Sequence, residues 1–305
     1  MIDTKDISVV IPILNAACFL SELFSTLENQ KPFPPKEIVL VDSGSTDNTI
    51  EIASKHQNVR IVPIRNFSHG RSRNLGAKNA TGEIIVLMTQ DALPRDEIWL
   101  QKLLKPFSDE KVAAVYSRQV PKPDAIFTER FFMMTRFPDG RNSQKKKATN
   151  DGELTLEDVF FSNVSSAIRR SILLQYPFDE TLIMSEDQQL SRDLLNAGYT
   201  VVYASDSVVI HSHNYTLSSI FKRYFDSVYS LTLIFPRHGV KTSVRMGANY
   251  LLKEIVYVLR NYPYKMPYYF LYLTSKIAGT LMGHFAKILP RCILKKVSMH
   301  HYHWE

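Results

Sequence analysis

Acidic residues stand where apolar runs end and where a polar helix pattern begins. Asp42 closes "EIVLVD", Asp91 follows "IIVLMTQ", and the pair Glu186 and Asp187 opens "EDQQLSRDLL". A carboxylate at the end of a buried strand can hold a divalent metal ion, and such an ion can bridge phosphates. Another carboxylate can accept the proton of a hydroxyl nucleophile. Together these acids indicate a group-transfer reaction.

A cluster of cationic side chains lies between two of these acids. The segment "NFSHGRSRNLG", residues 66–76, places His69, Arg71 and Arg73 where a strand is predicted to give way to a helix. The first N–H groups of a helix are unpaired and its dipole is positive there, so this end attracts anions. We expect the anion to belong to a substrate. The alternative for each arginine is an ordinary surface position.

Two common phosphate-binding loops are missing from the sequence. The turn after the first apolar run reads "PILNAA", without the glycines of a dinucleotide-binding loop, and no P-loop pattern occurs. Zinc-ligand spacing and RNP-like strands are also absent from the sequence, which argues against a nucleic-acid partner. The anion is therefore bound by another arrangement.

The elements that must position these residues alternate between strand and helix over the first 117 residues. Apolar, β-branched runs predict strands at 7–14, 37–42, 59–64, 82–88 and 112–117, with helical patterns between them. Repeated units of this kind predict an α/β fold with a mostly parallel sheet flanked by helices. In such sheets ligands bind beyond the carboxyl ends of the strands. The polar stretch "PDGRNSQKKKATNDGE" predicts a mobile loop, either a surface excursion or a flap over the site.

Composition and the absence of targeting segments indicate the cellular location of the protein. Cys18 and Cys292 lie far apart, which fits a reducing cytosol, and the N-terminus does not resemble a signal peptide. The sequence has no run of about 20 apolar residues that would predict a membrane-spanning helix. The longest candidate, "YYFLYLTSKIAGTLMG", is interrupted by Lys276. The net charge of +7 fits phosphorylated substrates or an anionic membrane. We expect a cytoplasmic protein, with peripheral contact to the inner face of the cell membrane.

Four stretches, in this order, resemble the successive motifs of inverting glycosyltransferases with the GT-A fold, glycosyltransferase family 2. They are "VVIPILNA", "IVLVDSGSTDNT", "RNLGAKNATGEIIVLMTQDA" and "SEDQQLSRDLLNAGY". Within that family, "FSHGRSRN" joined to "TQDA", with "HSHNYTLSSIFKRYFD" further on, is similar to bacterial rhamnosyltransferases. The resemblance implies a dTDP-β-L-rhamnose donor and an acceptor that is a growing O-antigen or another surface glycan, often lipid-linked. It also implies a catalytic domain over residues 1–225.

The resemblance implies a role for each candidate residue. Asp187 would be the general base, with Glu186 beside it, and Asp91 would bind Mg²⁺ or Mn²⁺ together with His211 or His213. The donor-binding residues would be Pro12, Asn15, Asp42, His69, Arg71, Arg73 and Gln90. The family's D-x-D motif is here Thr89-Gln90-Asp91, so metal-independent binding by the cations stays open.

Other interpretations of the same residues remain. Asp42 could build an Asx turn, Asp91 could cap a helix, and Asp187 could be a first-turn helix acid. For the whole chain the alternatives are a UDP-hexose donor, a sugar nucleotidyltransferase, or an inactive scaffold of a polysaccharide-assembly complex. The helical region over residues 226–305 could pack on the catalytic domain, form a homodimer, or lie at an anionic membrane.

Overall fold

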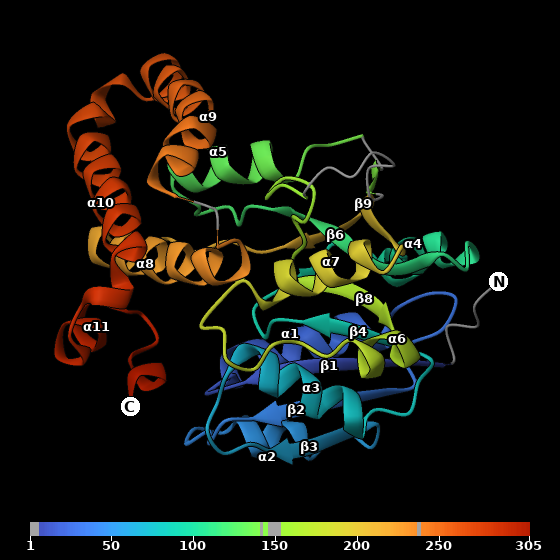
Figure 1. The fold of residues 1–305 in the computed structure, drawn as a ribbon. Helices are drawn as coiled ribbons and strands as arrows, with labels where there is room; N and C mark the ends of the chain where they lie inside the picture. The colour runs from blue at the N-terminus through green and yellow to red at the C-terminus, as the bar shows by residue number, and fades with distance from the viewer. Residues whose placement is uncertain (1–5, 141–142, 146–153, 237–238) are drawn as a thin grey trace. The chain divides into compact units, whose positions relative to one another are not determined.

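A computed structural model describes the chain except residues 1–5, 141–142, 146–153 and 237–238 (Figure 1). Most of the basic stretch expected to form a loop, residues 138–153, lies outside the described residues. Internal contacts divide the chain into two compact units. The first comprises residues 1–122, 133–181 and 186–212, and the second comprises 123–132, 182–185 and 213–305.

Four parallel strands form the N-terminal half of the sheet in the first unit. In spatial order they are β3 (Val59–Pro63), β2 (Glu37–Asp42), β1 (Ile7–Ile13) and β4 (Ile84–Met88). The connecting helices are α1 (Ala17–Glu28), α2 (Thr49–Ala53) and α3 (His69–Asn79). The expected parallel βα units are thereby confirmed.

Helices cover both faces of this half of the sheet. Ile7, Val9 and Ile11 share one hydrophobic core with the buried side of α1. On the opposite face α3 lies so close to β1 that a Cβ on Gly76 would overlap Val10. Strands buried on both faces can be apolar throughout, which explains their continuous apolar runs.

The other half of the sheet is mixed. The strand β8 (Ser165–Arg169) runs antiparallel between β4 and β6 (Val112–Val120), and β9 (Thr200–Ile210) runs parallel to β6. The short strands β5 (Leu93–Pro94) and β7 (Ser143–Lys145) pair antiparallel with β9. The helices here are α4 (Trp99–Leu104), η2 (Lys105–Ser108), α6 (Arg170–Gln175) and α7 (Glu186–Asn196). The sheet as a whole is that of the expected GT-A fold.

The second unit is helical. Its elements after the sheet are α8 (Leu217–Ile234), α9 (Val240–Asn261), η3 (Pro263–Lys265), α10 (Met266–His284), η4 (Ala286–Ile288), α11 (Arg291–Val297) and η5 (His301–Trp304). The helix α5 (Phe127–Arg136) begins in this unit. The domain boundary expected at residue 225 falls inside α8, which belongs entirely to the second unit.

Close helix packing and one buried ion pair organise this unit. A Cβ on Gly279 of α10 would overlap the carbonyl oxygen of Phe221 of α8. Lys276 is 4% exposed, and its Nζ lies 2.9 Å from a carboxylate oxygen of the buried Glu254. The charge that interrupts the apolar run of α10 is therefore neutralised inside the unit. Within the described residues, no helix combines the length and hydropathy needed to span a membrane.

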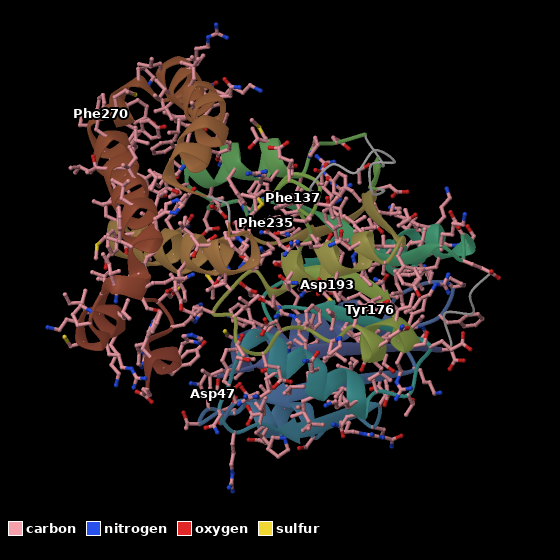
Figure 2. All side chains as sticks on the ribbon, in the orientation of Figure 1. Asp47, Phe137, Tyr176, Asp193, Phe235 and Phe270 are labelled. Carbon is pink, nitrogen blue, oxygen red and sulfur yellow. The ribbon has the colours of Figure 1, made fainter. Side chains whose placement is uncertain are left out.

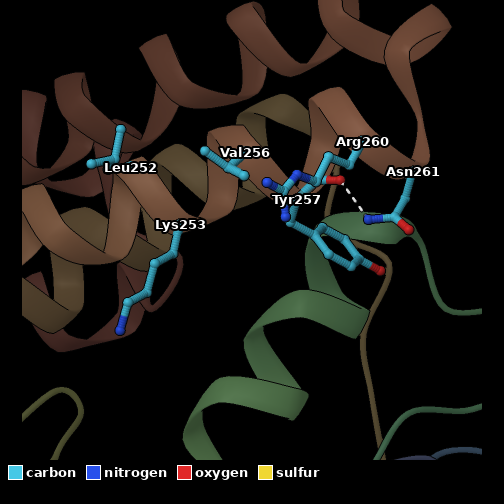
Figure 3. Close-up of a pocket in the computed structure, with 6 residues that line it drawn as sticks. All are labelled: Leu252, Lys253, Val256, Tyr257, Arg260 and Asn261. Atoms are coloured by element: carbon cyan, nitrogen blue, oxygen red, sulfur yellow. Dashed lines mark hydrogen bonds between the residues drawn. The ribbon is translucent and has the colours of Figure 1, made fainter.

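Apolar side chains remain on the outside of the second unit. Phe270 of α10 is one of them (Figure 2). On α9, Leu252 and Val256 line a surface hollow together with the side chains of Lys253 and Arg260 (Figure 3).

Candidate active site

The loops after β1 and β2 meet at the carboxyl edge of the sheet. The parallel register places Ile13 beside Asp42, so the residues that follow both strands come together. Asn15 has a left-handed backbone (φ 49°), its Oδ1 accepts from Thr46 N at 2.8 Å, and its N–H donates to Ser45 Oγ at 2.9 Å. Asn15, Asp42 and Pro12 of β1 thus lie at the same edge of the sheet, near the ends of β1 and β2. Their contact with a nucleoside stays a prediction.

Asp42 forms the Asx-type turn that was its alternative role. Its carboxylate accepts from Gly44 N and Ser45 N, both at 3.1 Å, and from Ser45 Oγ at 2.6 Å. Asp42 is only 8% exposed. A carboxylate offers about four acceptor positions, so the turn and a further hydrogen bond to a ligand are compatible.

Gln90 joins two of the loops at this edge. Its Oε1 accepts from Leu14 N at 2.9 Å, and its Nε2 donates to Leu14 O at 3.2 Å. The side chain therefore fixes the loop after β1 against the end of β4. This contact is structural, and a donor-binding role for Gln90 stays a prediction.

The anions that meet Arg71 and Arg73 are carboxylates of the protein itself. Arg71 Nε donates to Glu180 at 2.9 Å, and Arg73 Nη1 donates to Glu186 at 2.6 Å. The second pair is buried, with side chains 5% and 6% exposed. Its geometry indicates a structural role for Arg73, and a donor contact by either arginine stays a prediction.

The helix α3, which carries Arg71 and Arg73, also contacts the segment that leads to α7. Asn74 Oδ1 accepts from Phe178 N at 3.0 Å, and Asn74 Nδ2 donates to Phe178 O at 2.9 Å. A Cβ on Gly70 would lie 2.6 Å from Asp179 O, so glycine permits this close approach. We call these contacts, with Arg71–Glu180 and Arg73–Glu186, the α3 brace. His69 begins α3, its ring 5.1 Å from that of Phe67.

Asp187 lies in the first turn of α7, directly after the buried Glu186. Its Oδ1 accepts from Gln188 N at 2.8 Å, and its Oδ2 lies 3.4 Å from the donor Asn163 N. Burial, and then the charge of Glu186, raise the pKa of Asp187 to about 7, while Arg73 opposes the increase. A general base is most effective with a pKa near the working pH. The preceding Ser185 has φ 65°, a conformation that costs energy and is common at functional sites.

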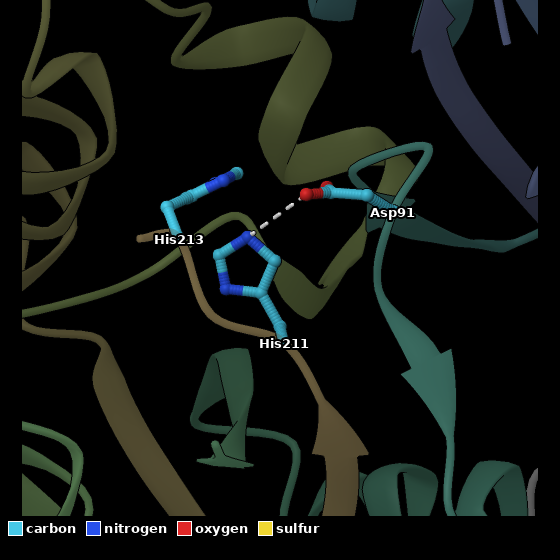
Figure 4. A group of neighbouring side chains, drawn as sticks. All are labelled: Asp91, His211 and His213. Atoms are coloured by element: carbon cyan, nitrogen blue, oxygen red, sulfur yellow. Dashed lines mark ion pairs between the residues drawn. The ribbon is translucent and has the colours of Figure 1, made fainter. Parts of the chain in front are cut away.

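Asp91, His211 and His213 form a candidate metal site (Figure 4). One ligand atom from each lies within 4.8 Å of the others. His211 Nε2 is 3.6 Å from Asp91 Oδ2, and both side chains are largely buried. Carboxylate oxygen and imidazole nitrogen are ligands that divalent metals accept.

Gln119 orients His211, and the sequence did not indicate it. Gln119 Nε2 donates to Ser162 Oγ at 2.9 Å, which leaves its Oε1 to accept from His211 Nδ1 at 3.1 Å. In this arrangement Nδ1 carries the proton and the lone pair of Nε2 faces Asp91. Metal-binding histidines are commonly held in this way through their second nitrogen. The residues present therefore fit a cation.

The mixed sheet, mostly parallel and flanked by helices, is that of the GT-A fold. The model of the family described as Glycosyl transferase family 2 matches residues 8–176. The chain belongs to this family.

Two relatives match almost the whole chain. The "O-antigen chain rhamnosyltransferase RfbN" of Salmonella typhimurium is 32% identical over 98% of this chain and 96% of its own length. The "O-antigen chain rhamnosyltransferase WbaN" of Salmonella anatum is 30% identical over 98% and 95%. Among solved structures, the mannosyltransferase PcManGT of Pyrobaculum calidifontis, in complex with GDP-Man and Mn²⁺, has a TM-score of 0.61 and 18% identity. The match covers 90% of this chain and 87% of that one, and it supports the fold.

Proposed function

We propose that this glycosyltransferase transfers L-rhamnose from dTDP-β-L-rhamnose to a hydroxyl of a lipid-linked surface polysaccharide, in the cytoplasm. The observation that carries the proposal is the near full-length similarity to two O-antigen chain rhamnosyltransferases. The sequence features "FSHGRSRN" and "TQDA" support the same donor.

In this proposal Asp187 accepts the proton of the acceptor hydroxyl as the oxygen attacks the anomeric carbon. The carbon–diphosphate bond breaks on the opposite face, so a β-linked donor gives an α-linked product. The α3 brace holds the segment before α7 and supplies Arg73, whose charge favours the ionised form of the base. The role of Asp187 is supported by its raised pKa and by its place beside the buried pair.

Asp91, His211 and His213 would hold a divalent ion. When bound there, the ion would neutralise the negative charge that develops on the leaving diphosphate. Two imidazoles among three protein ligands favour Mn²⁺ over Mg²⁺, because Mg²⁺ prefers oxygen ligands.

A donor panel tests the proposal. Binding and nucleoside diphosphate release are measured with dTDP-rhamnose, dTDP-glucose, UDP-glucose and UDP-N-acetylglucosamine, with Mn²⁺ and with EDTA. We expect dTDP-rhamnose to be used best, by up to ~10²-fold, because a pocket shaped for a methyl group leaves an added hydroxyl poorly paired. Preferred turnover of a UDP-hexose would overturn the rhamnose assignment and leave the transferase class intact.

A further inference from the structure

The excess of basic over acidic residues lies in the C-terminal part of the chain. Residues 255–304 contain seven Lys and Arg and no Asp or Glu. The remaining 30 of the 37 basic residues balance all 30 acidic ones, so the rest of the chain is neutral. The formal net charge of +7 therefore equals that of 50 consecutive residues of the second unit, of whose cations Lys276 is paired with the preceding Glu254.

The helix α10 has an apolar side that its own unit does not cover. Its inner side comprises the buried residues Tyr269, Tyr272, Lys276, Gly279 and Gly283. Residues at helical spacing on another side remain in solvent, where Phe270 is 60%, Ile277 46% and Leu281 41% exposed. Because exposed apolar area of this extent is unfavourable in water, it indicates a docking surface.

Basic residues are interleaved with apolar ones beyond the end of α10. Phe285, Ile288 and Ile293 are exposed, and Ile288 is 78% exposed. Between and after them stand the exposed cations Lys287, Arg291, Lys295 and Lys296. The helix α9 repeats the pattern, since its exposed Leu252, Val256 and Leu259 are accompanied by Lys253 and Arg260 (Figure 3).

We propose that the docking surface, defined by the exposed apolar and basic residues of α10, α11 and the segment between them, binds an anionic phospholipid bilayer. Apolar side chains would enter the headgroup boundary, and the cations would attract the anionic headgroups. A second copy of the chain is a poorer occupant, because it would bring two positively charged surfaces together. The inference deepens the proposed function, on which it rests for its purpose, since a lipid-linked acceptor lies at such a bilayer.

Vesicle sedimentation tests the docking without any sugar donor or acceptor. The full chain is mixed with vesicles of equimolar phosphatidylglycerol and phosphatidylcholine, or with phosphatidylcholine alone, at low and high salt. We expect sedimentation with the anionic vesicles, weakened by salt, and none with the neutral ones. A parent protein that stays in the supernatant with anionic vesicles would overturn the proposal.

Surface variants then locate the contact. The variants Ile277→Ser/Leu281→Ser and Lys295→Glu/Lys296→Glu are expected to lower the partition coefficient at least ~10-fold. Matched controls on the first unit, Ile98→Ser/Leu174→Ser and Lys105→Glu/Lys111→Glu, change equally exposed side chains and are expected to bind like the parent.

Two further readouts separate the other outcomes. Donor binding by all these variants is expected to match the parent, so a wrong donor assignment would leave the vesicle result unchanged. Light scattering gives the mass in solution. A dimer that the surface variants dissociate, with vesicle binding unaffected, would assign the surface to a second copy and contradict membrane docking.

Discussion

Asp187 combines a first-turn helix position with a buried, negatively charged neighbour. If it is the general base, Asp187→Asn lowers the rate of transfer by ~10²–10⁴-fold, because the amide cannot accept the proton. Donor affinity changes little, since the base meets the acceptor and not the nucleotide. The measurement compares kcat with the donor Kd, and Asp193→Asn on the same helix is the control. Transfer within a few-fold of the parent would remove Asp187 from the mechanism.

The raised pKa of Asp187 gives the reaction a pH dependence with a definite sign. If Asp187 is the base, it must be ionised to act, so kcat is expected to rise with pH through about 7 and to level off above it. Replacing Glu186 by Gln removes the charge that raises this pKa and leaves Arg73 unopposed. Both effects move the midpoint of the pH–rate profile to lower pH. An unchanged midpoint in Glu186→Gln would show that another group controls the profile.

Gln119 is expected to act on metal binding through His211. In Gln119→Leu the imidazole loses the acceptor that fixes its Nδ1–H, and Mn²⁺ affinity falls about 10–100-fold. Calorimetric titration of Mn²⁺ measures this, and addition of excess Mn²⁺ should restore activity. Metal affinity equal to the parent's would leave Gln119 with a packing role only.

Asp91→Ala, by comparison, should abolish any dependence of donor binding on divalent ions.

At the level of single residues, the positions of the acids relative to strands and helices could be predicted from the sequence, and the partners of the arginines could not. Asp91 follows an apolar run and Asp187 lies at the start of a polar helix pattern, and both features are visible in the local sequence. Arg73 and Glu186 lie 113 positions apart, so the pairing arises only when α3 and α7 are brought together. The contact of Gln119 is equally long-range, because its partner His211 directly follows another strand, β9, and no local pattern marks such a residue.

At the scale of elements, the α3 brace is the feature most open to direct test. Arg73→Met leaves Glu186 as an unpaired buried charge and should lower the free energy of unfolding by about 3–5 kcal/mol. The double variant Arg73→Met/Glu186→Leu should recover most of that loss, because two apolar side chains replace the ion pair. Urea unfolding of the parent, single and double variants measures both effects. Unchanged stability with weakened donor binding would instead place Arg73 at the donor.

The elements themselves could be predicted where apolar runs were continuous. The predicted strand 37–42 coincides with β2, the ends of β1, β3 and β4 differ from prediction by a residue or two, and β6 extends three residues beyond the predicted 112–117. The strand β9 continues from Thr200 to Ile210 across a register shift opposite Ser117 and Arg118, which no local pattern indicates. The position of β8 between β4 and β6 depends on long-range pairing, which local patterns do not encode.

The contact between the segment after β2 and the start of α1 could not be predicted from the sequence either. Thr49 Oγ1 and Asp47 Oδ2 accept from the backbone N–H groups of Ala16 and Ala17 at the start of α1. The segment from the loop after β2 to the first residue of α2 thereby satisfies two N–H groups at the start of a helix whose own N-cap, Ala16, has no side chain to do so. A carboxylate at this end is also favoured by the helix dipole.

For the whole molecule, the central claim is an inverting transfer in one displacement. Nuclear magnetic resonance of the product made with dTDP-β-L-rhamnose and a lipid-linked acceptor extract gives the anomeric configuration of the transferred sugar. A base on the face opposite the leaving diphosphate predicts an α-L-rhamnoside, and Asp187→Asn should yield none above background. A β-L-rhamnoside would contradict single displacement and with it the role assigned to Asp187.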